Sequence, residues 1–520
     1  MGMSKKINDI WKEQTYFERI INFIGIIIMI YGIHTSIFMN SVNRSLWLDE
    51  ASLTQSIMTR GFWGLISKQL DNMQAAPLLY LWIEKLNVSL FGGTEYVLRV
   101  YSVIAYLLTI LLAAVCAIQC NIKYPFLISA FLANNRFLLD YSNQVKQYMN
   151  ECFWVLLLIV IYNLCLNNNK TFKLKYGIVF TFTCFLCILG GNPSIFMAGG
   201  ILICEFVSSI LHKNKDGLKR TIIIGIIVVA FFAIYYLFFL KRGNSEGMQN
   251  YWKNNFLLLK LDKTSQNKNI NLLNSVCNMV FSATMFRAAI LIGFLIALYK
   301  KNRTIISMTI CLLLGMCASI VHMFPIEQRL WLFSIPVGSL IMFYGINQIF
   351  TFAIDSTCKQ PEKPQRKMDF WNIILVILLV AFIIGENGIE LYLDSAHVYH
   401  SGEEANDLIA YVQQNINSDE KAFIYFHSIP VTKFKIGYDV NRIGNTDSDN
   451  IIWSAGPATD ENNLNSDFDN IVQAKRCYII TSHVVDKRWL PLKTKLEEVG
   501  TVTEALNSHN TYLYYFEISE

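Results

Sequence analysis

IINFIGIIIMIYGIHTSIFMNSVNRSLWLDE, residues 20–50, decides how this chain is interpreted. Its first part, from Ile20 to Met39, is almost wholly apolar and long enough to cross a bilayer as a helix. It lacks the small-residue cleavage site of a removable signal peptide, so we expect a retained helix. The stretch ends in SLWLDE, where Asp49 and Glu50 are adjacent. Two carboxylates at the end of a membrane-spanning helix need an explanation.

Similar apolar blocks recur along the chain. The protein has 520 residues, of which 53% are hydrophobic and 16% charged, whereas soluble domains average about a quarter charged. The 12 Cys lie mostly inside the apolar blocks and are expected to act as small hydrophobic residues. We therefore predict a polytopic α-helical membrane protein with about eleven transmembrane helices, at 20–40, 95–119, 125–141, 149–166, 176–191, 194–211, 221–240, 276–299, 304–323, 330–353 and 370–389.

The placement of Lys and Arg predicts the orientation. With a cytoplasmic N-terminus, every expected inner segment carries Lys or Arg, as the positive-inside rule requires: 1–19, 120–124, 167–175, 212–220, 300–303 and 354–369. An odd number of spans then puts the tail outside. We expect a transmembrane domain, 1–389, with a first outer loop at 41–94. Residues 390–520 alternate strand-like and helical patterns, which predicts a soluble extracytoplasmic α/β domain.

Charged residues gather where the expected helices meet the outer surface. Asp49 and Glu50 follow the first span, and Lys146 and Glu151 lie near the junction of the third and fourth. Each has a simpler explanation. Acidic residues favour helix N-termini, and a lysine at the interface can snorkel. Glu95 and Arg99 are spaced as an i,i+4 ion pair.

Four short motifs together resemble the GT-C membrane glycosyltransferases, and in particular the branch that holds the protein O-mannosyltransferases and the lipid A aminoarabinose transferases. They are W-x-D-E after the first span, P-L-x-Y, F-G-x-x-E-x-x-x-R-x-x-S and Y-S-x-x-x-K-x-Y. The resemblance covers residues 45–150, and the soluble tail is similar to tails on bacterial members. The matching residues are Trp47, Asp49, Glu50, Pro77, Leu78, Tyr80, Phe91, Gly92, Glu95, Arg99, Ser102, Tyr141, Ser142, Lys146 and Tyr148.

The resemblance implies a polyprenyl-phosphate sugar donor and inversion at the anomeric carbon. Asp49 corresponds to the family's first-loop aspartate and is expected to act as general base, since a hydroxyl acceptor must lose its proton as it attacks. The leaving phosphate needs cations nearby, and the candidates are Lys146, Arg329 and Arg99. Tyr80, Tyr148 and Glu151 are further candidates for substrate binding.

The sequence departs from the family pattern at two places. Many relatives carry His or Lys before the Pro-Leu of the first loop, but here the loop contains no His, which argues against a divalent metal there. Relatives also often have Glu where this chain has Gln144. Because Gln cannot titrate, a second-carboxylate role falls to Glu50 or Glu151, or is absent. The sequence establishes no cofactor, and a divalent metal stays open as an alternative.

Two other functions stay open at this point. A transporter or flippase for a lipid-linked sugar would favour broken or polar helices at the membrane midplane, and Gln144 is compatible with a catalytically silent scaffold. For a transferase, the acceptor hydroxyl can belong to a protein Ser or Thr, a lipid-linked glycan or a cell-envelope polymer. We expect contact with membrane lipids, no nucleic-acid partner, and a location in the bacterial plasma membrane.

Overall fold

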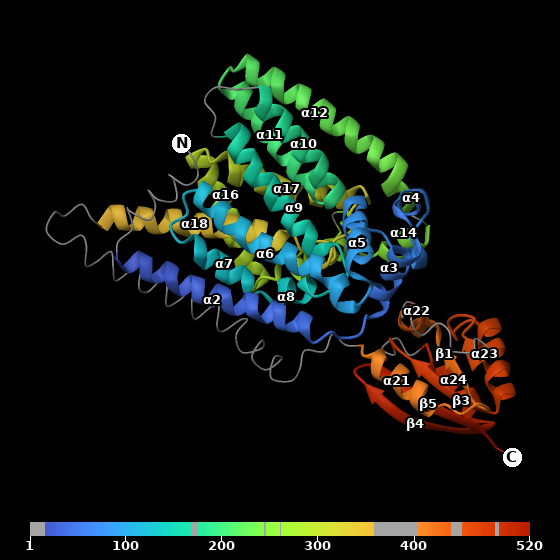
Figure 1. Ribbon diagram of the computed structural model, residues 1–520. Coiled ribbons are helices and arrows are strands. Elements are labelled where there is room, and N and C mark those ends of the chain that lie inside the picture. The colour runs from blue at the N-terminus through green and yellow to red at the C-terminus, as the bar shows by residue number, and fades with distance from the viewer. Residues whose placement is uncertain are drawn as a thin grey trace. The chain divides into compact units, whose positions relative to one another are not determined.

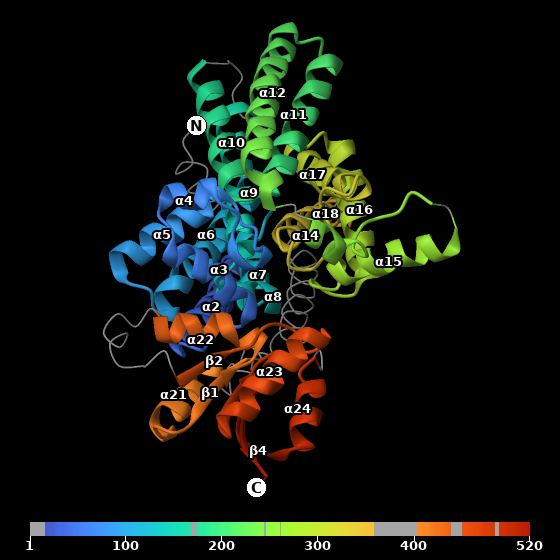
Figure 2. The same ribbon diagram turned by 90° about the vertical axis from the view of Figure 1, so that its right-hand side faces the viewer.

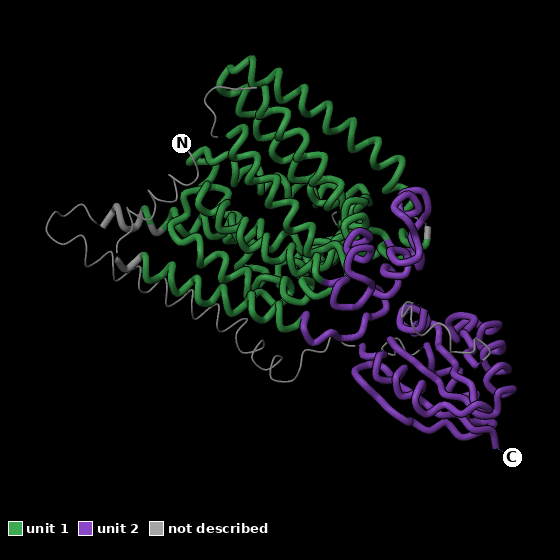
Figure 3. Tube along the Cα trace, viewed as in Figure 1, with its two compact units in different colours: residues 1–39, 75–83, 100–397 green, residues 40–74, 84–99, 398–520 purple. Residues whose placement is uncertain are grey.

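The computed structural model describes residues 16–167, 174–243, 246–260, 262–357, 403–437, 450–483 and 488–519. Internal contacts divide the chain into two compact units (Figure 3). Unit 1 comprises Met1–Met39, Ala75–Ile83 and Val100–His397. Unit 2 joins three segments that are far apart in sequence: Asn40–Gln74, Glu84–Arg99 and Val398–Glu520. The C-terminal region therefore shares a unit with most of the loop that connects the first two expected spans.

Long apolar helices dominate the chain (Figure 1). In the described residues, seven are long and apolar enough to cross a membrane, so the chain is an integral membrane protein. They are α2 (Tyr16–Ser41), α6 (Glu95–Gln119), α9 (Tyr148–Tyr162) with the π-helical Asn163–Asn167, α11 (Ser194–Leu211), α12 (Lys215–Tyr235) with the π-helical Tyr236–Leu240 and α13 (Lys241–Gly243), α16 (Ala283–Lys300) and α17 (Arg303–Ile320).

The expected total of eleven spans is not confirmed. Apolar helix α10 (Leu174–Gly190) is shorter than the seven, and α18 (Ser334–Thr357) begins four residues later than expected. The block expected at 276–299 is also split: α15 (Lys263–Cys277) precedes α16, and the Asn278 side chain accepts the Ala283 N–H at 2.8 Å between them. The last expected span, 370–389, lies outside the described residues.

One expected span, 125–141, is wrong as a single helix. It forms α7 (Pro125–Ala133) and α8 (Arg136–Ser142), which are separated by Asn134 and Asn135. Asn135 caps α8 by accepting the Leu138 N–H at 3.1 Å, and its amide donates to Met279 O at 2.8 Å. Asn side chains compete for backbone hydrogen bonds and favour helix caps over helix interiors. Hydropathy alone does not detect that competition.

Glycine allows close helix crossings in unit 1. A Cβ atom on Gly200 of α11 would collide with the Ser307 carbonyl of α17, and one on Gly293 of α16 would collide with the Ile341 carbonyl of α18. Small residues at such crossings are typical of helices that pack inside a membrane. In contrast, α12 covers α10 and α11 (Figures 1 and 2) and keeps an apolar face exposed, as expected for a helix that faces lipid.

The C-terminal region of unit 2 is an α/β domain, as the sequence predicts. Its sheet has the order β2-β1-β3-β5-β4. β1 (Lys421–Ile424) is parallel to β2 (Ile451–Trp453) and to β3 (Arg476–Thr481), whereas β5 (Thr511–Ile518) is antiparallel to β3 and to β4 (Gly500–Ser508). The described helices are α21 (Ala405–Asn415), α22 (Ile429–Gly437), α23 (Glu461–Ala474) and α24 (Leu490–Glu497).

An apolar core holds this domain together. Alternate residues of β1, β3 and β5 point into it, and Cys477 is one of them. Burial raises the pKa of the Cys477 thiol to about 12, so this cysteine is an inert packing residue. The buried members of the core are Phe423, Tyr425, Ala458, Ile471, Cys477, Ile479, Trp489, Leu492, Leu496, Tyr514 and Phe516.

The first loop adds several short helices. They are α3 (Leu48–Thr59), α4 (Phe62–Ser67), a 3₁₀ turn at Asp71–Met73, and α5 (Leu78–Phe91), which begins directly after Pro77. Within unit 2, α3 packs against α22 of the α/β domain. Elsewhere, the short helix α14 (Glu246–Trp252) lies between α13 and α15 in the chain.

Candidate active site

Helix α3 begins at the WLDE motif. Trp47 is its N-cap residue, and Asp49 and Glu50 lie in its first turn, where acidic side chains interact favourably with the helix dipole. The Glu50 carboxylate also reaches back to accept the Trp47 N–H at 3.3 Å, which is the glutamate half of a capping box. The simpler explanation offered by the sequence therefore holds for Glu50: it does cap a helix.

Glu50 has a second task, because it lies between two arginines. Its oxygens accept hydrogen bonds from Arg44 Nη1 at 3.0 Å, Arg99 Nε at 3.1 Å and Arg99 Nη2 at 2.9 Å. Glu50 is 0% exposed, and the two arginines are 3% and 1% exposed. Breaking a buried ion pair of this kind by removing one partner typically costs about 3–5 kcal/mol. The cluster is a structural tie in the first loop.

Arg99 donates four hydrogen bonds to protein acceptors. Besides Glu50, it donates to Arg44 O at 2.7 Å and to Ser45 O at 2.9 Å. The expected i,i+4 pair with Glu95 gives way to a pair with Glu50, which lies 49 residues earlier in the chain. Glu95 pairs with Lys435 of α22 at 3.1 Å and accepts from Asn406 at 3.0 Å. Both charges of the sequence motif therefore tie segments of unit 2 together.

Asp49 has a different environment from its neighbour. Successive residues of an α-helix point about 100° apart, and Asp49 is half-buried whereas Glu50 is fully buried. Gln74 Nε2 donates to its carboxylate at 3.4 Å. Of the two carboxylates in the motif, Asp49 is thus the more accessible one.

The far end of α3 is also secured. Lys85 of α5 donates to the carbonyls of Ile57 at 3.0 Å and Met58 at 3.1 Å, and a cation is favourable at a helix C-terminus. Partial burial lowers the pKa of Lys85. Asp71 accepts hydrogen bonds from Ser56 and Arg60. Helix α3 is therefore held along its length, which limits the movement of Asp49.

A second group of expected site residues lies in unit 1. Tyr80 is fully buried and stacks on Tyr101 with ring centroids 5.8 Å apart. Tyr148 is buried at the start of α9 and meets Tyr141 edge-to-face at 5.4 Å. Lys146 is 3% exposed in the turn between α8 and α9.

Backbone contacts join the segments that carry this group. Gln147 Nε2 donates to Ala75 O at 3.2 Å, and Ser102 Oγ donates to Gln144 O at 2.8 Å. Glu151 is 3% exposed and accepts the Asn192 N–H at 3.2 Å. The residues before α5, the start of α6 and the turn before α9 therefore lie together.

Arg329 has different neighbours. It lies in the segment between α17 and α18, where Nη2 donates to the Tyr251 hydroxyl at 3.2 Å. Its guanidinium also lies 5.1 Å from the centroid of the Trp252 ring, which is a cation–π contact. The described contacts connect Arg329 to α14 instead of to the group around Lys146.

Sequence reasoning missed three residues that shape the first loop. Arg44 lies six residues before Glu50 and could have been suspected from NRSLWLDE, because it follows the first span directly. Glu403 and Glu404 accept the backbone N–H groups of Leu48 and Ser45, each at 3.0 Å. No local signal connects residues that lie more than 350 positions apart.

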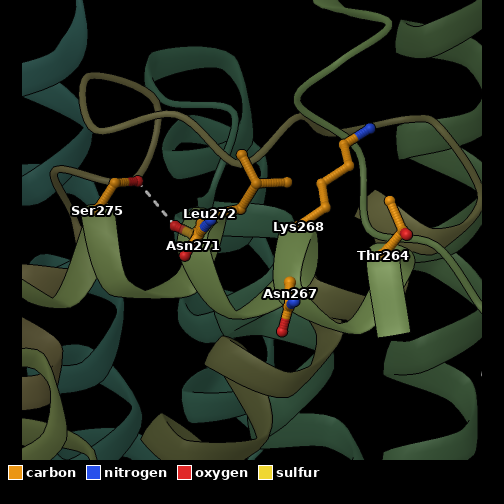
Figure 4. A pocket seen from close by; sticks show the side chains of 6 residues that line it. All are labelled: Thr264, Asn267, Lys268, Asn271, Leu272 and Ser275. Atoms are coloured by element: carbon orange, nitrogen blue, oxygen red, sulfur yellow. Dashed lines mark hydrogen bonds between the residues drawn. The ribbon is translucent and has the colours of Figure 1, made fainter. Parts of the chain in front are cut away.

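A pocket beside α15 is lined by polar residues and one leucine of that single helix (Figure 4): Thr264, Asn267, Lys268, Asn271, Leu272 and Ser275. It has no carboxylate in its lining. Within the described part of the chain, no group of three or more His, Cys, Asp or Glu side chains could hold a metal ion.

Comparisons with known proteins place the fold. Neither a family model nor a curated protein matches this sequence. The crystal structure of ArnT from Cupriavidus metallidurans bound to undecaprenyl phosphate has a TM-score of 0.53 at 12% identity, over 95% of this chain and 97% of that one. The archaeal oligosaccharyltransferase AglB from Archaeoglobus fulgidus, in complex with an inhibitory peptide and a dolichol-phosphate, has a TM-score of 0.51 at 11% identity, over 97% and 75%.

A further structure agrees with these. The Archaeoglobus fulgidus oligosaccharyltransferase complex with Zn and sulfate has a TM-score of 0.54 at 12% identity, over 94% of this chain and 72% of that one. ArnT and AglB are glycosyltransferases of the GT-C fold. The resemblance seen in the sequence is thus confirmed at the level of the fold: the chain has the GT-C fold.

Proposed function

We propose that this protein is an inverting glycosyltransferase that moves a sugar from a polyprenyl-phosphate donor to a hydroxyl acceptor. The observation that carries the proposal is the WLDE helix: a buried arginine cluster secures Glu50, and the adjacent Asp49 stays accessible on a helix held at both ends. The fold supports the same reaction class, because the similar ArnT and AglB structures hold undecaprenyl phosphate and dolichol-phosphate.

Asp49 is the proposed general base. The acceptor oxygen attacks the anomeric carbon as its proton passes to the Asp49 carboxylate. The bond between that carbon and the phosphate oxygen breaks, and polyprenyl phosphate leaves with the electron pair. A single displacement of this kind inverts the anomeric configuration. No step is assigned to a metal ion.

Lys146 is the proposed partner of the donor phosphate. A lysine in a buried turn next to Tyr148 and Glu151 can meet an anionic head group with little competing water. Tyr80, Tyr148 and Glu151 are proposed to contact the donor in the same unit, and Arg329 is the second candidate for the phosphate. Glu50 and Arg99 are proposed to shape the first loop, since their hydrogen bonds are directed at one another and at the backbone.

The reaction is proposed to occur on the extracytoplasmic face of a bacterial plasma membrane, with the N-terminus in the cytoplasm. The distribution of Lys and Arg supports this orientation. A reporter that is active only outside the cytoplasm, fused after Glu520, should be active. A fusion that is active only in the cytoplasm would contradict the proposed topology and the face assigned to the reaction.

Purified protein in liposomes tests the function directly. We expect radiolabel from a pool of polyprenyl-phosphate sugars to pass to an envelope-extract acceptor, with release of unlabelled polyprenyl phosphate. A transporter would instead move the intact labelled lipid between leaflets without cleaving the glycosidic bond. Labelled lipid that crosses the bilayer uncleaved, with no labelled acceptor, would contradict the proposal.

A further inference from the structure

The α/β domain of unit 2 has a topological switch point. β2 and β3 lie on opposite sides of β1 in the sheet, and all three strands are parallel. In open α/β sheets, ligands bind outside the carboxyl ends of the strands at such a point. Here those ends are the residues after β1, Tyr425–Ser428, and the residues after β3, Ser482 and His483. Ser428 and Ser482 share a hydrogen bond of 3.0 Å, and the rings of His427 and His483 lie 5.2 Å apart.

The neighbour of this switch point is the first loop. His483 Nδ1 lies 2.6 Å from Glu403 Oε1, and the other oxygen of Glu403 accepts the Leu48 N–H at 3.0 Å. Helix α22, which begins directly after Ser428, packs against α3. The first loop of the same chain thus lies at the position where other α/β domains bind a separate ligand.

Glu404 binds the first loop at Ser45, three residues before Leu48. Its Oε2 accepts the Ser45 N–H at 3.0 Å, while the Ser45 carbonyl accepts from Arg99 at 2.9 Å and Arg44 at 3.3 Å. The Glu404 carbonyl in turn accepts the Thr511 hydroxyl of β5 at 2.9 Å. The Ser45 peptide is therefore held on one side by the α/β domain and on the other by the arginines that bind Glu50.

Both glutamates act on backbone groups. Leu48 is the first residue of α3, and its N–H is one of the donors that a helix leaves without an intrahelical partner. The two carboxylates, each 8% exposed, are directed at two N–H groups within one four-residue stretch. Contacts of this kind fix where the chain lies, and Asp49 is the next residue.

We propose that the C-terminal domain positions Asp49, with Glu403 and Glu404 as the positioning residues that clamp the N–H groups of Leu48 and Ser45. This proposal rests on the proposed function only for the role of Asp49 as general base. The clamp itself is a property of unit 2. Loss of the clamp should displace Asp49 relative to the acceptor hydroxyl, while residues that bind the donor stay in place.

Hydrogen–deuterium exchange of the full-length protein without substrate tests the clamp. In Glu403→Ala and Glu404→Ala, exchange in peptides covering residues 45–48 should rise about tenfold or more relative to the parent. Glu403→Gln and Glu404→Gln should restore much of the protection, because the amide oxygen still accepts. Glu420→Ala is the matched control: Glu420 is buried in the same domain and accepts from Asn417 N at 2.8 Å and Tyr515 Oη at 2.7 Å, not from the first loop.

The control also separates clamping from stability. Glu420→Ala should raise exchange in the sheet and leave residues 45–48 protected. Unchanged exchange at 45–48 in both alanine variants would overturn the clamp. If Glu420→Ala raised exchange at residues 45–48 as much as Glu403→Ala and Glu404→Ala do, the effect would come from lower stability of the domain, and the clamp would be overturned as well.

Kinetics test the link to Asp49. In both alanine variants, kcat should fall about ten- to hundredfold while KM for the lipid donor stays within about twofold, and the Gln variants should recover most of the rate. Raised exchange with an unchanged kcat would overturn the positioning role. Failure of the proposed function would be seen separately, because the parent protein would then transfer no sugar. The hydrogen-exchange comparison would still show whether Glu403 and Glu404 hold residues 45–48.

Discussion

Helices α3 and α9 begin in a similar way but have different surroundings. Each carries a buried glutamate in or near its first turn, with a basic residue five or six positions earlier: Arg44 and Glu50 for α3, Lys146 and Glu151 for α9. Glu50 accepts three N–H groups from arginines and one from the backbone. Glu151 accepts a backbone N–H, that of Asn192, at 3.2 Å.

The comparison separates two uses of buried charge. A carboxylate has about four acceptor sites, and the four hydrogen bonds of Glu50 match that capacity with donors from the protein itself. Among the contacts described, Glu151 accepts one such bond, and it lies in a membrane domain where a charged group is costly unless it meets a partner. The contrast agrees with the proposal that the start of α3 holds the first loop and that the start of α9 binds substrate.

Asp49→Asn provides the largest expected effect. The turnover number should fall by about 10²–10⁴-fold, which is the usual contribution of a general base, while the melting temperature stays that of the parent. Asp469→Asn is the control, because Asp469 is an exposed aspartate of α23 and lies outside the first loop. Near-normal turnover in purified Asp49→Asn would remove Asp49 from this role.

Glu50→Gln should act mainly on stability. The substitution leaves Arg44 and Arg99 buried without a carboxylate, and loss of one partner from a buried ion pair costs about 3–5 kcal/mol. Thermal unfolding in detergent should therefore shift to lower temperature, unlike that of Asp49→Asn. A melting curve identical to that of the parent would show that the arginine cluster does not stabilise the loop, and the contrast with α9 would lose its basis.

Lys146→Gln should weaken donor binding or turnover about ten- to hundredfold. A charge-assisted hydrogen bond contributes about 1.5–3 kcal/mol, and Lys146→Arg should recover part of the loss because the charge remains. Lys253→Gln, at an exposed lysine, is the control for a general loss of positive charge. If Lys146→Gln binds and turns over donor like the parent, Lys146 is an interfacial residue and Arg329 becomes the next candidate.

Lys435→Ala should have the smallest effect. The lysine pairs with buried Glu95 at 3.1 Å, but its side chain is 38% exposed, and ion pairs of such exposure contribute about 0–1 kcal/mol. We expect a shift in melting temperature of a few degrees at most and an unchanged turnover number. A loss as large as that of Glu50→Gln would mean that the contact between α22 and the first loop depends on this pair.

Most of the apolar blocks predicted from the sequence form helices in the described part of the chain, but 125–141 and 276–299 are each divided between two helices. Hydropathy over about twenty residues is a local property, so it can be read from a window of sequence. The α/β pattern of the tail is equally local, and the described part of the tail does contain both strands and helices. The break at Asn134–Asn135 was missed because part of its support comes from tertiary hydrogen bonds, such as that between Asn135 and Met279.

The sequence by itself determined that this is a membrane protein with the WLDE motif at a helix start and with an α/β domain at its C-terminal end. Only the tertiary structure decided which charges meet. Spacing favoured an Arg99–Glu95 pair, yet Arg99 binds Glu50, because a fixed backbone can bring a fully buried carboxylate into two-pronged contact with a guanidinium. The contacts of Glu403 and Glu404 with residues 45–48 depend in the same way on chain folding: hydrogen bonds are satisfied in space, and sequence distance does not limit them.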